Sequence, residues 1–193
     1  RVNDLGIDAR RPLTAVQVIT VSVWRARNEE IAHAVARAEA VRLARRIVDL
    51  DQGLKTNNAQ LTELIKISPA APLLEETGFG PVSAAVCLTV WSHPGRVRSQ
   101  AAFAALAGVS PIPASSGNTV RHRLNRGGDR TLNKALHIVA LSRMTHDPET
   151  RNYVEKRQAE GRTTKEIRRS LKRYLARKVY RTLNSPKPSL IGA

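Results

Sequence analysis

Residues 109–130, here called the basic segment, combine the side chains of this chain that could do chemistry on a phosphate. The segment is polar and contains two serines before a glycine, Ser115-Ser116-Gly117. Gly117 leaves little bulk beside the hydroxyls, so a phosphodiester could approach them, although by spacing alone the three residues are typical of a polar turn. The arginines that could neutralise the charge of a phosphate there are Arg121, Arg123, Arg126 and Arg130. His122 is expected to contact a phosphate or the backbone, and the alternative is a role in proton transfer. The sequence predicts that this segment is a long, unstructured basic loop, and a loop of this size inside a compact domain is usually functional.

A serine hydroxyl is a weak nucleophile at neutral pH and needs a base or a metal ion to activate it. No Asp or Glu lies between residues 96 and 126, so the activating group must come from elsewhere. The histidines are scattered and lack Cys or His partners at metal spacing, which argues against a zinc site. A tyrosine nucleophile, Tyr174, is an alternative, but it lies on the apolar stripe of the last predicted helix, which favours a packing role.

Gly78-Phe79-Gly80-Pro81 predicts the turn of a helix-hairpin-helix, with Pro81 at the first position of the second helix. Glycines let backbone approach a phosphate closely, and the helix N-terminus offers free N–H groups. The alternative is a tight turn that only packs two helices together.

The charge of the chain is concentrated in its second half. Of 193 residues, 32 are Lys or Arg and 16 are Asp or Glu. Residues 1–94 carry a net charge of +1, whereas residues 95–193 carry 21 basic and 6 acidic residues, a net of +15. Such asymmetry indicates a polyanion partner, most commonly nucleic acid, and the alternative is a basic surface kept for solubility. Aromatic residues make up only 4% of the chain, which argues against single-strand binding by stacking platforms on strands.

The elements that must position these groups are predicted to be helices, so the fold class is all-α. A long helical arm, residues 25–68, begins near Asn28 as N-cap, with Glu29 and Glu30 in its first turn. Its a/d heptad seam predicts a coiled coil or helical hairpin, with one polar layer at Asn57; the alternative is an amphipathic helix packed on its own domain. The seam consists of Leu43, Ile47, Leu50, Leu54, Leu61 and Leu64. Residues 1–24 are expected to be an N-terminal linker, and their apolar pattern is too short to distinguish a strand from a helix.

A compact helical domain is predicted over residues 69–184, followed by a tail, 185–193. Residues 82–91 are apolar on most sides, which predicts a buried helix with Cys87 as a small core residue. Helix N-caps are predicted at Ser99, Asp147 and Thr163, the last with Glu166 as a capping box. The final helix keeps one apolar face and covers the rest with Lys and Arg.

Taken in order, several motifs resemble one known family. They are Gly78-Phe79-Gly80-Pro81, the stretch 102–111 (AFAALAGVSP), Ser115-Ser116-Gly117, and Arg126-Gly127-Gly128 followed by residues 132–136 (LNKAL). Their spacing resembles the C-terminal transposase domain of DEDD-type bacterial insertion-sequence transposases, which are bridge-RNA-guided serine recombinases. The resemblance covers about residues 70–183, and the arm resembles the coiled-coil linker of that family.

The resemblance implies that Ser116, or Ser115 as the runner-up, attacks a DNA phosphate and forms a covalent phosphoserine. It implies DNA as donor and target, a guide RNA, and self-association through the arm. In the family a RuvC-like domain with four acidic residues precedes the arm and would hold a divalent metal, expected to be magnesium. This chain begins at Arg1 and lacks that domain, since residues 1–24 with Asp4 and Asp8 are too short for it. We therefore expect a C-terminal portion of the enzyme, inactive in cleavage by itself and without a metal site of its own.

The expected function is thus that of a transposase domain for DNA strand cleavage and exchange; the alternative is a non-enzymatic helix-hairpin-helix module that binds DNA or RNA. The residues expected to contact nucleic acid are Gly78, Gly80, Arg121, His122, Arg123, Arg126, Arg130, Lys134, Arg168, Arg169, Lys172 and Arg173. One cysteine and the lack of a membrane-length apolar stretch fit a reducing bacterial cytoplasm, and the resemblance adds association with the nucleoid.

Overall fold

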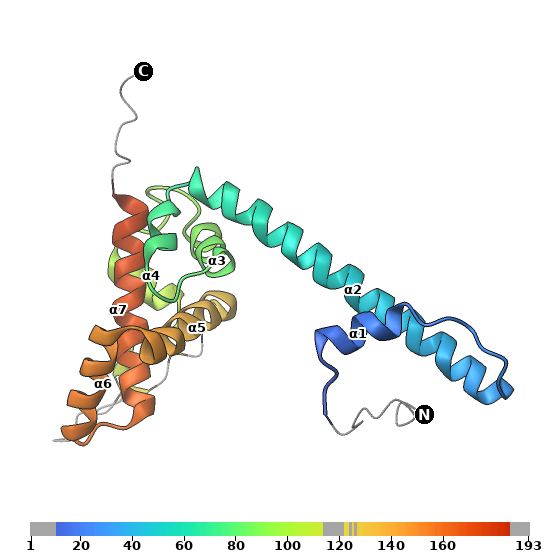
Figure 1. The fold of residues 1–193 in the computed structure, drawn as a ribbon. Helices are drawn as coiled ribbons and strands as arrows, with labels where there is room; N and C mark the ends of the chain where they lie inside the picture. The colour runs from blue at the N-terminus through green and yellow to red at the C-terminus, as the bar shows by residue number, and fades with distance from the viewer. Residues whose placement is uncertain (1–10, 114–121, 124, 126, 186–193) are drawn as a thin grey trace. The chain divides into compact units, whose positions relative to one another are not determined.

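The computed structural model describes residues 11–113, 122, 123, 125 and 127–185 (Figure 1). The prediction of an all-α fold is confirmed. The described elements are α-helices, one 3₁₀ helix and a single pair of two-residue strands. The chain divides into two compact units, residues 1–59 and 60–193, here called the N-terminal and C-terminal units.

In the N-terminal unit, the sequence of residues 1–24 did not distinguish a strand from a helix, and the structure has helix α1 there, Ala15–Ser22. Thr14 caps it in a capping box with Gln17, which satisfies N–H groups at the helix start. Val18 and Val21, three residues apart and therefore on one face, pack with Ala44 of helix α2. This small contact is the apolar core of the unit among its described residues.

Helix α2 spans Ile31–Lys66, 36 residues without a break at Gly53. The prediction of a start at Asn28 was wrong, because Glu29 and Glu30 precede the helix and no acidic residue lies in its first turn. The Glu29 carboxylate instead accepts from Arg37 at 2.5 Å, and the Arg37 guanidinium lies 5.2 Å from the Trp24 ring centroid. That pairing holds the residues before the helix outside it and moves the first helical bond, from Ala34 N–H to the Glu30 carbonyl, downstream.

The C-terminal unit packs short helices around one long one. In order they are the 3₁₀ helix η2 (Ala71–Glu75), α3 (Pro81–Trp91), α4 (Gln100–Leu106), α5 (Arg130–His146), α6 (Pro148–Ala159) and α7 (Thr164–Asn184). Helix α7 contacts η2, α3, α4, α5 and α6 (Figure 1). The predicted caps are confirmed: Ser99, Asp147 and Thr163 each accept a backbone N–H, and Thr163 forms the capping box with Glu166.

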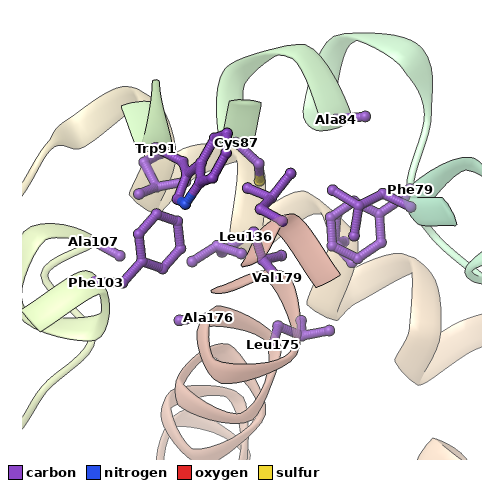
Figure 2. Packing of buried hydrophobic residues seen from close by; sticks show 14 of the residues in the cluster. Phe79, Ala84, Cys87, Trp91, Phe103, Ala107, Leu136, Leu175, Ala176 and Val179 are labelled. Atoms are coloured by element: carbon purple, nitrogen blue, oxygen red, sulfur yellow. The ribbon is translucent and has the colours of Figure 1, made fainter. Parts of the chain in front are cut away.

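The core of this unit draws on helices far apart in the sequence. Figure 2 shows Trp91 and Cys87 of α3 meeting Phe103, Leu136 and Val179. Phe103 and Leu136 are 0% exposed. The prediction that Cys87 is a core residue is confirmed, and burial raises the pKa of its thiol to about 12. The last turns of α2 belong to the same core through Ile65, so the arm is anchored at its C-terminal end.

Candidate nucleic-acid interface

The turn before α3 has two glycines in different surroundings. Gly78 has a positive φ of 89°, and a Cβ there would meet the Val139 carbonyl of α5 at 3.0 Å, so this glycine is required for packing. Gly80 is the N-cap of α3 and would have no neighbour within 4 Å of a Cβ. The element before the turn is the five-residue 3₁₀ helix η2. Of the two glycines, Gly80 is therefore the one whose surroundings leave room for a ligand.

The two ends of the basic segment meet through a close backbone contact. Gly108 ends α4 with a positive φ of 66°, and a Cβ built on Gly128 would overlap the Gly108 backbone. The N–H of Asp129 donates to the Leu106 carbonyl at 2.7 Å. Only glycine fits at position 128, which accounts physically for the paired glycines seen in the sequence.

Two asparagines complete this junction by capping the C-terminal end of α4. The Asn125 amide donates to the Ala105 carbonyl at 3.3 Å and the Asn133 amide to the Ala107 carbonyl at 2.7 Å. Carbonyls at the end of a helix lack partners within it. We call Gly108, Asn125, Gly128 and Asn133 the clamp, because together they fix where the basic segment leaves and rejoins the helices.

A short antiparallel ladder lies inside the basic segment, where the sequence predicted a loop without strands. Strand β1 (Ile112–Pro113) pairs with β2 (His122–Arg123), with Ile112 opposite Arg123 and Pro113 opposite His122. Strands of two residues are too short to show a periodicity in sequence. The ladder brings positions 113 and 122 together.

The predicted nucleophile Ser116 and the runner-up Ser115 lie outside the described residues, as do Arg121 and Arg126. For His122 and Arg123 the structure gives the backbone alone. Their predicted roles stay predictions.

Helix α7 reaches the clamp with two of the predicted basic residues. The Lys172 ammonium donates to the Asn133 side-chain oxygen at 2.6 Å, and the Arg173 guanidinium donates to the Ser110 hydroxyl at 3.1 Å. Asn133 thus links α4, α5 and α7 through a single side chain. Arg169 of α7 is exposed, as are Arg130 and Lys134 at the start of α5.

Burial and neighbouring positive charges lower the pKa values of two side chains at this place. Burial, followed by Arg168 and Arg169, lowers the pKa of Lys172. Burial, followed by Lys172 and Arg168, also lowers the pKa of His137 on α5. We call His137, Arg168, Arg169 and Lys172 the cation cluster. Sequence reasoning missed His137, because nothing in its local spacing says that α7 faces it.

The cation cluster has no carboxylate within ion-pair distance among the described residues, which include every Asp and Glu of residues 60–193. Two acids of the C-terminal unit pair away from the cluster: Glu76 with Arg143 at 3.3 Å and with Lys178 at 2.5 Å, and Asp147 with Arg143 at 3.1 Å. Glu166, in the first turn of α7, pairs with Arg162 at 3.7 Å, and the charge of Arg169 also contributes to lowering the pKa of Glu166. Hydrogen bonding from Thr150, more than the charge of Arg143, lowers the pKa of Asp147. Acids thus form ion pairs with Lys178 of α7 and with Arg162 before its start, whereas the members of the cation cluster form no ion pair among the described residues.

The described residues offer no place for a metal ion, since no three His, Cys, Asp or Glu side chains gather among them. In the same described part of the chain, no helix is long and apolar enough to cross a membrane.

Comparison with known proteins agrees with this geometry. Residues 70–155 match the model of the Transposase IS116/IS110/IS902 family. The chain is 30% identical over 123 residues to the insertion element IS110 uncharacterized 43.6 kDa protein of Streptomyces coelicolor, covering 63% of this chain and 30% of that protein. It is 28% identical over 131 residues to the insertion element IS900 uncharacterized 42 kDa protein of Mycobacterium paratuberculosis, covering 66% and 33%. The chain thus spans about a third of the length of these relatives.

The matched residues include the turn before α3, the clamp and helix α5. Over residues 70–155, the chain therefore matches a transposase domain of the IS116/IS110/IS902 family.

Proposed function

We propose that this chain is the part of a DNA transposase that grips nucleic acid and carries the serine nucleophile for strand cleavage and exchange. The observation that carries the proposal is the cation cluster beside the clamp: positive charge without paired carboxylates, next to the points where the basic segment joins the described helices. The match to a transposase family supplies DNA as the substrate.

Electrostatics favours a phosphate at this place. Lys172 and His137 lose part of their affinity for protons to burial and to neighbouring cations. A bound phosphodiester supplies the negative charge that the protein leaves out, and it relieves the repulsion among the cations. Arg130 and Lys134, exposed on the first turns of α5, extend the same surface.

The clamp has a role in this reaction that does not depend on contact with DNA. It holds the two ends of the basic segment, the segment whose sequence contains Ser116, against α4 and α5. Holding a nucleophile in place is worth a large part of a reaction barrier. Ser116 Oγ attacks phosphorus and loses its proton, and the departing deoxyribose oxygen gains one, leaving a phosphoserine ester.

The partner molecules proposed from the resemblance are a guide RNA and a second copy of the chain. The second copy has support in the helical seam: Leu50 is 49% exposed, Leu54 is 66% exposed and Leu64 is 61% exposed. Apolar side chains spaced this way on the exposed face of a helix are typical of a coiled-coil interface. The activating metal would be held by the acidic RuvC-like domain that the resemblance implies.

The test of the nucleophile uses the protein supplied with that acidic domain, guide RNA and DNA. Ser116→Ala is expected to abolish cleavage and the covalent protein–DNA adduct while DNA binding persists; Ser115→Ala is the matched control. Adduct formation that survives Ser116→Ala and stops with Ser115→Ala would move the nucleophile by one residue. Adduct formation that survives the double substitution would contradict the serine mechanism and leave the non-enzymatic binding module.

A further inference from the structure

A cavity of about 350 Å³ opens between α5, α6 and α7, in the part of the C-terminal unit where acids neutralise Arg143. Tyr153 of α6 and Tyr174 of α7 both line it, and Leu171 contributes apolar surface. Neither the basic segment nor the cation cluster contributes to its lining. The volume is within the range of small-molecule sites, about 300–1,000 Å³.

Tyr153 and Tyr174 are the two rings of this unit that line the cavity, and Tyr153 also packs against the core. Phe79, Trp91 and Phe103 are buried, and Tyr180 packs on Phe103 with a ring-centroid distance of 6.1 Å. Tyr174, by contrast, is 50% exposed, and Tyr153 is partly buried. A chain with few aromatic residues thus lines one cavity with two rings, and the exposed ring of Tyr174 offers a stacking surface for a flat ligand.

The charge of the cavity argues against a phosphate as its occupant. Arg143 donates to Glu76, Asp147 and Thr150, so its positive charge is already matched by two carboxylates. Glu149 adds a further carboxylate to the lining. A phosphate would meet repulsion there, whereas an uncharged ring that carries N–H groups could donate to Glu149 or to the Ser170 hydroxyl.

The backbone of a bound strand would find cations just outside the cavity. Arg177 is exposed one helical turn beyond Tyr174, and a separation of three residues puts both side chains on one face of α7. Arg151 of α6 is also exposed. Among the described residues neither has a carboxylate within ion-pair distance. A cavity without unpaired positive charge, flanked by cations, is complementary to a nucleotide, base inside and phosphate outside.

We propose that this cavity takes one unstacked nucleobase of a bound nucleic-acid strand, stacked on Tyr174 and bordered by Tyr153. The proposal rests on the nucleic-acid binding argued above and adds a site that reads an unpaired nucleotide. Bases removed from a stack are bound in this manner, between aromatic rings and with polar groups on their edges.

The test compares the binding of two DNA duplexes to the 193-residue chain: one fully paired, and one with a single unpaired 2-aminopurine. Binding is followed by fluorescence anisotropy, and stacking by the quenching of 2-aminopurine emission. We expect tighter binding and quenching with the unpaired duplex. Tyr174→Leu is expected to weaken that binding about tenfold and remove the quenching, while binding of the paired duplex is unchanged. Tyr174→Phe, which keeps the ring, retains both.

Two controls separate stacking from charge and from folding. Arg169→Ala is expected to weaken the binding of both duplexes equally. Helicity and thermal midpoint are measured for each variant; if Tyr174→Leu lowers them, Tyr174→Gln replaces it at this half-exposed position. Unpaired RNA and DNA oligonucleotides of one sequence then show which strand the cavity prefers.

The outcomes are distinct. Equal affinity of the wild-type chain for both duplexes, or an unchanged affinity in Tyr174→Leu, overturns the base pocket and leaves the proposed function standing. Failure to bind any duplex or oligonucleotide at low salt overturns both.

Discussion

Helix α2 and helix α7 are the two longest helices described in this protein, and they use their apolar residues in opposite ways. In α7, Ile167, Leu175 and Val179 are at most 1% exposed, and the cations lie on the remaining faces. In α2, residues 49–60 are all exposed, with Leu50 and Leu54 among them. Helix α7 is therefore stabilised by its own unit, whereas the middle of α2 presents an apolar seam to whatever binds it.

Charge divides the two helices as well. Side-chain pairs neutralise cations along α2, as between Arg42 and Glu39 at 2.6 Å. The cation cluster at the start of α7 has no such partner among the described residues. One helix thus lacks an apolar partner and the other lacks an anionic one, which indicates two different kinds of ligand for the two units.

The largest expected effect tests whether the two helical regions differ in burial as described. Leu136→Ala, at a 0% exposed site of α5, should lower the free energy of unfolding of the C-terminal unit by about 2–5 kcal/mol. The matched Leu54→Ala, at a 66% exposed site of α2, should change it by less than about 0.5 kcal/mol. Urea unfolding followed by circular dichroism at micromolar protein measures both. A large loss for Leu54→Ala that disappears on dilution would show that a second copy covers the seam.

A pair of glycines should respond with opposite signs. Gly128→Ala puts a methyl group into the Gly108 backbone and should destabilise the C-terminal unit by about 1–3 kcal/mol. Gly53→Ala lies in open space within α2 and should stabilise that helix by about 0.5–1 kcal/mol. Thermal unfolding of the two variants gives the comparison. A neutral Gly128→Ala would mean that the clamp opens easily and does not hold the basic segment.

The charge difference between the helices is tested by the salt dependence of DNA binding. Arg169→Ala should weaken binding and reduce the slope of log K against log salt by about 0.9, the effect of one lost phosphate contact. Arg46→Ala, an exposed arginine of α2, should leave the slope unchanged. Anisotropy titrations of one duplex at several salt concentrations provide the slopes. If both substitutions reduce the slope by the same amount, the DNA contacts both units.

Features that depend on three or four neighbouring residues were predictable from the sequence. The caps at Ser99, Asp147 and Thr163 are of this kind, because a cap side chain reaches only the first turn of its own helix. The prediction of where α2 starts failed because it depended on a more distant residue. Asn28 and the glutamates after it have the composition of a helix start, but Arg37, eight residues away from Glu29, holds that carboxylate outside the helix.

The candidate site was predictable in region and not in geometry. Counting charges located it in the second half of the chain, and the motif Arg126-Gly127-Gly128 falls within it, but the contact between Gly128 and Gly108 was not predicted. The bonds that build it join residues far apart in sequence: Lys172 to Asn133, 39 residues apart, and Arg173 to Ser110, 63 apart. No local pattern tells which lysine of a basic helix is tied to an asparagine and which is free to meet DNA.

The smallest expected effect concerns pH and His137. Its pKa is lowered in the folded protein by burial and by Lys172 and Arg168. As the pH falls, His137 is therefore protonated in the unfolded chain before it is protonated in the folded protein. Stability from this group is present above the unfolded pKa of about 6.5 and is lost as the pH falls toward the folded pKa. The carboxylates of Asp147 and Glu166, whose pKa values are also lowered, lose their contribution only at more acidic pH.

His137→Gln should therefore flatten the decline in stability of the free protein between about pH 7 and 5. DNA binding should respond to pH in the opposite direction, because a phosphate beside the cation cluster favours the charged imidazole. As the pH falls from about 7 to 5, the affinity of the wild-type protein for DNA should therefore rise more than the affinity of His137→Gln. Chemical denaturation and anisotropy at matched pH values measure the two slopes. If the DNA affinities of both proteins respond to pH identically, the bound phosphate does not interact with His137 and contacts the arginines of α7 instead.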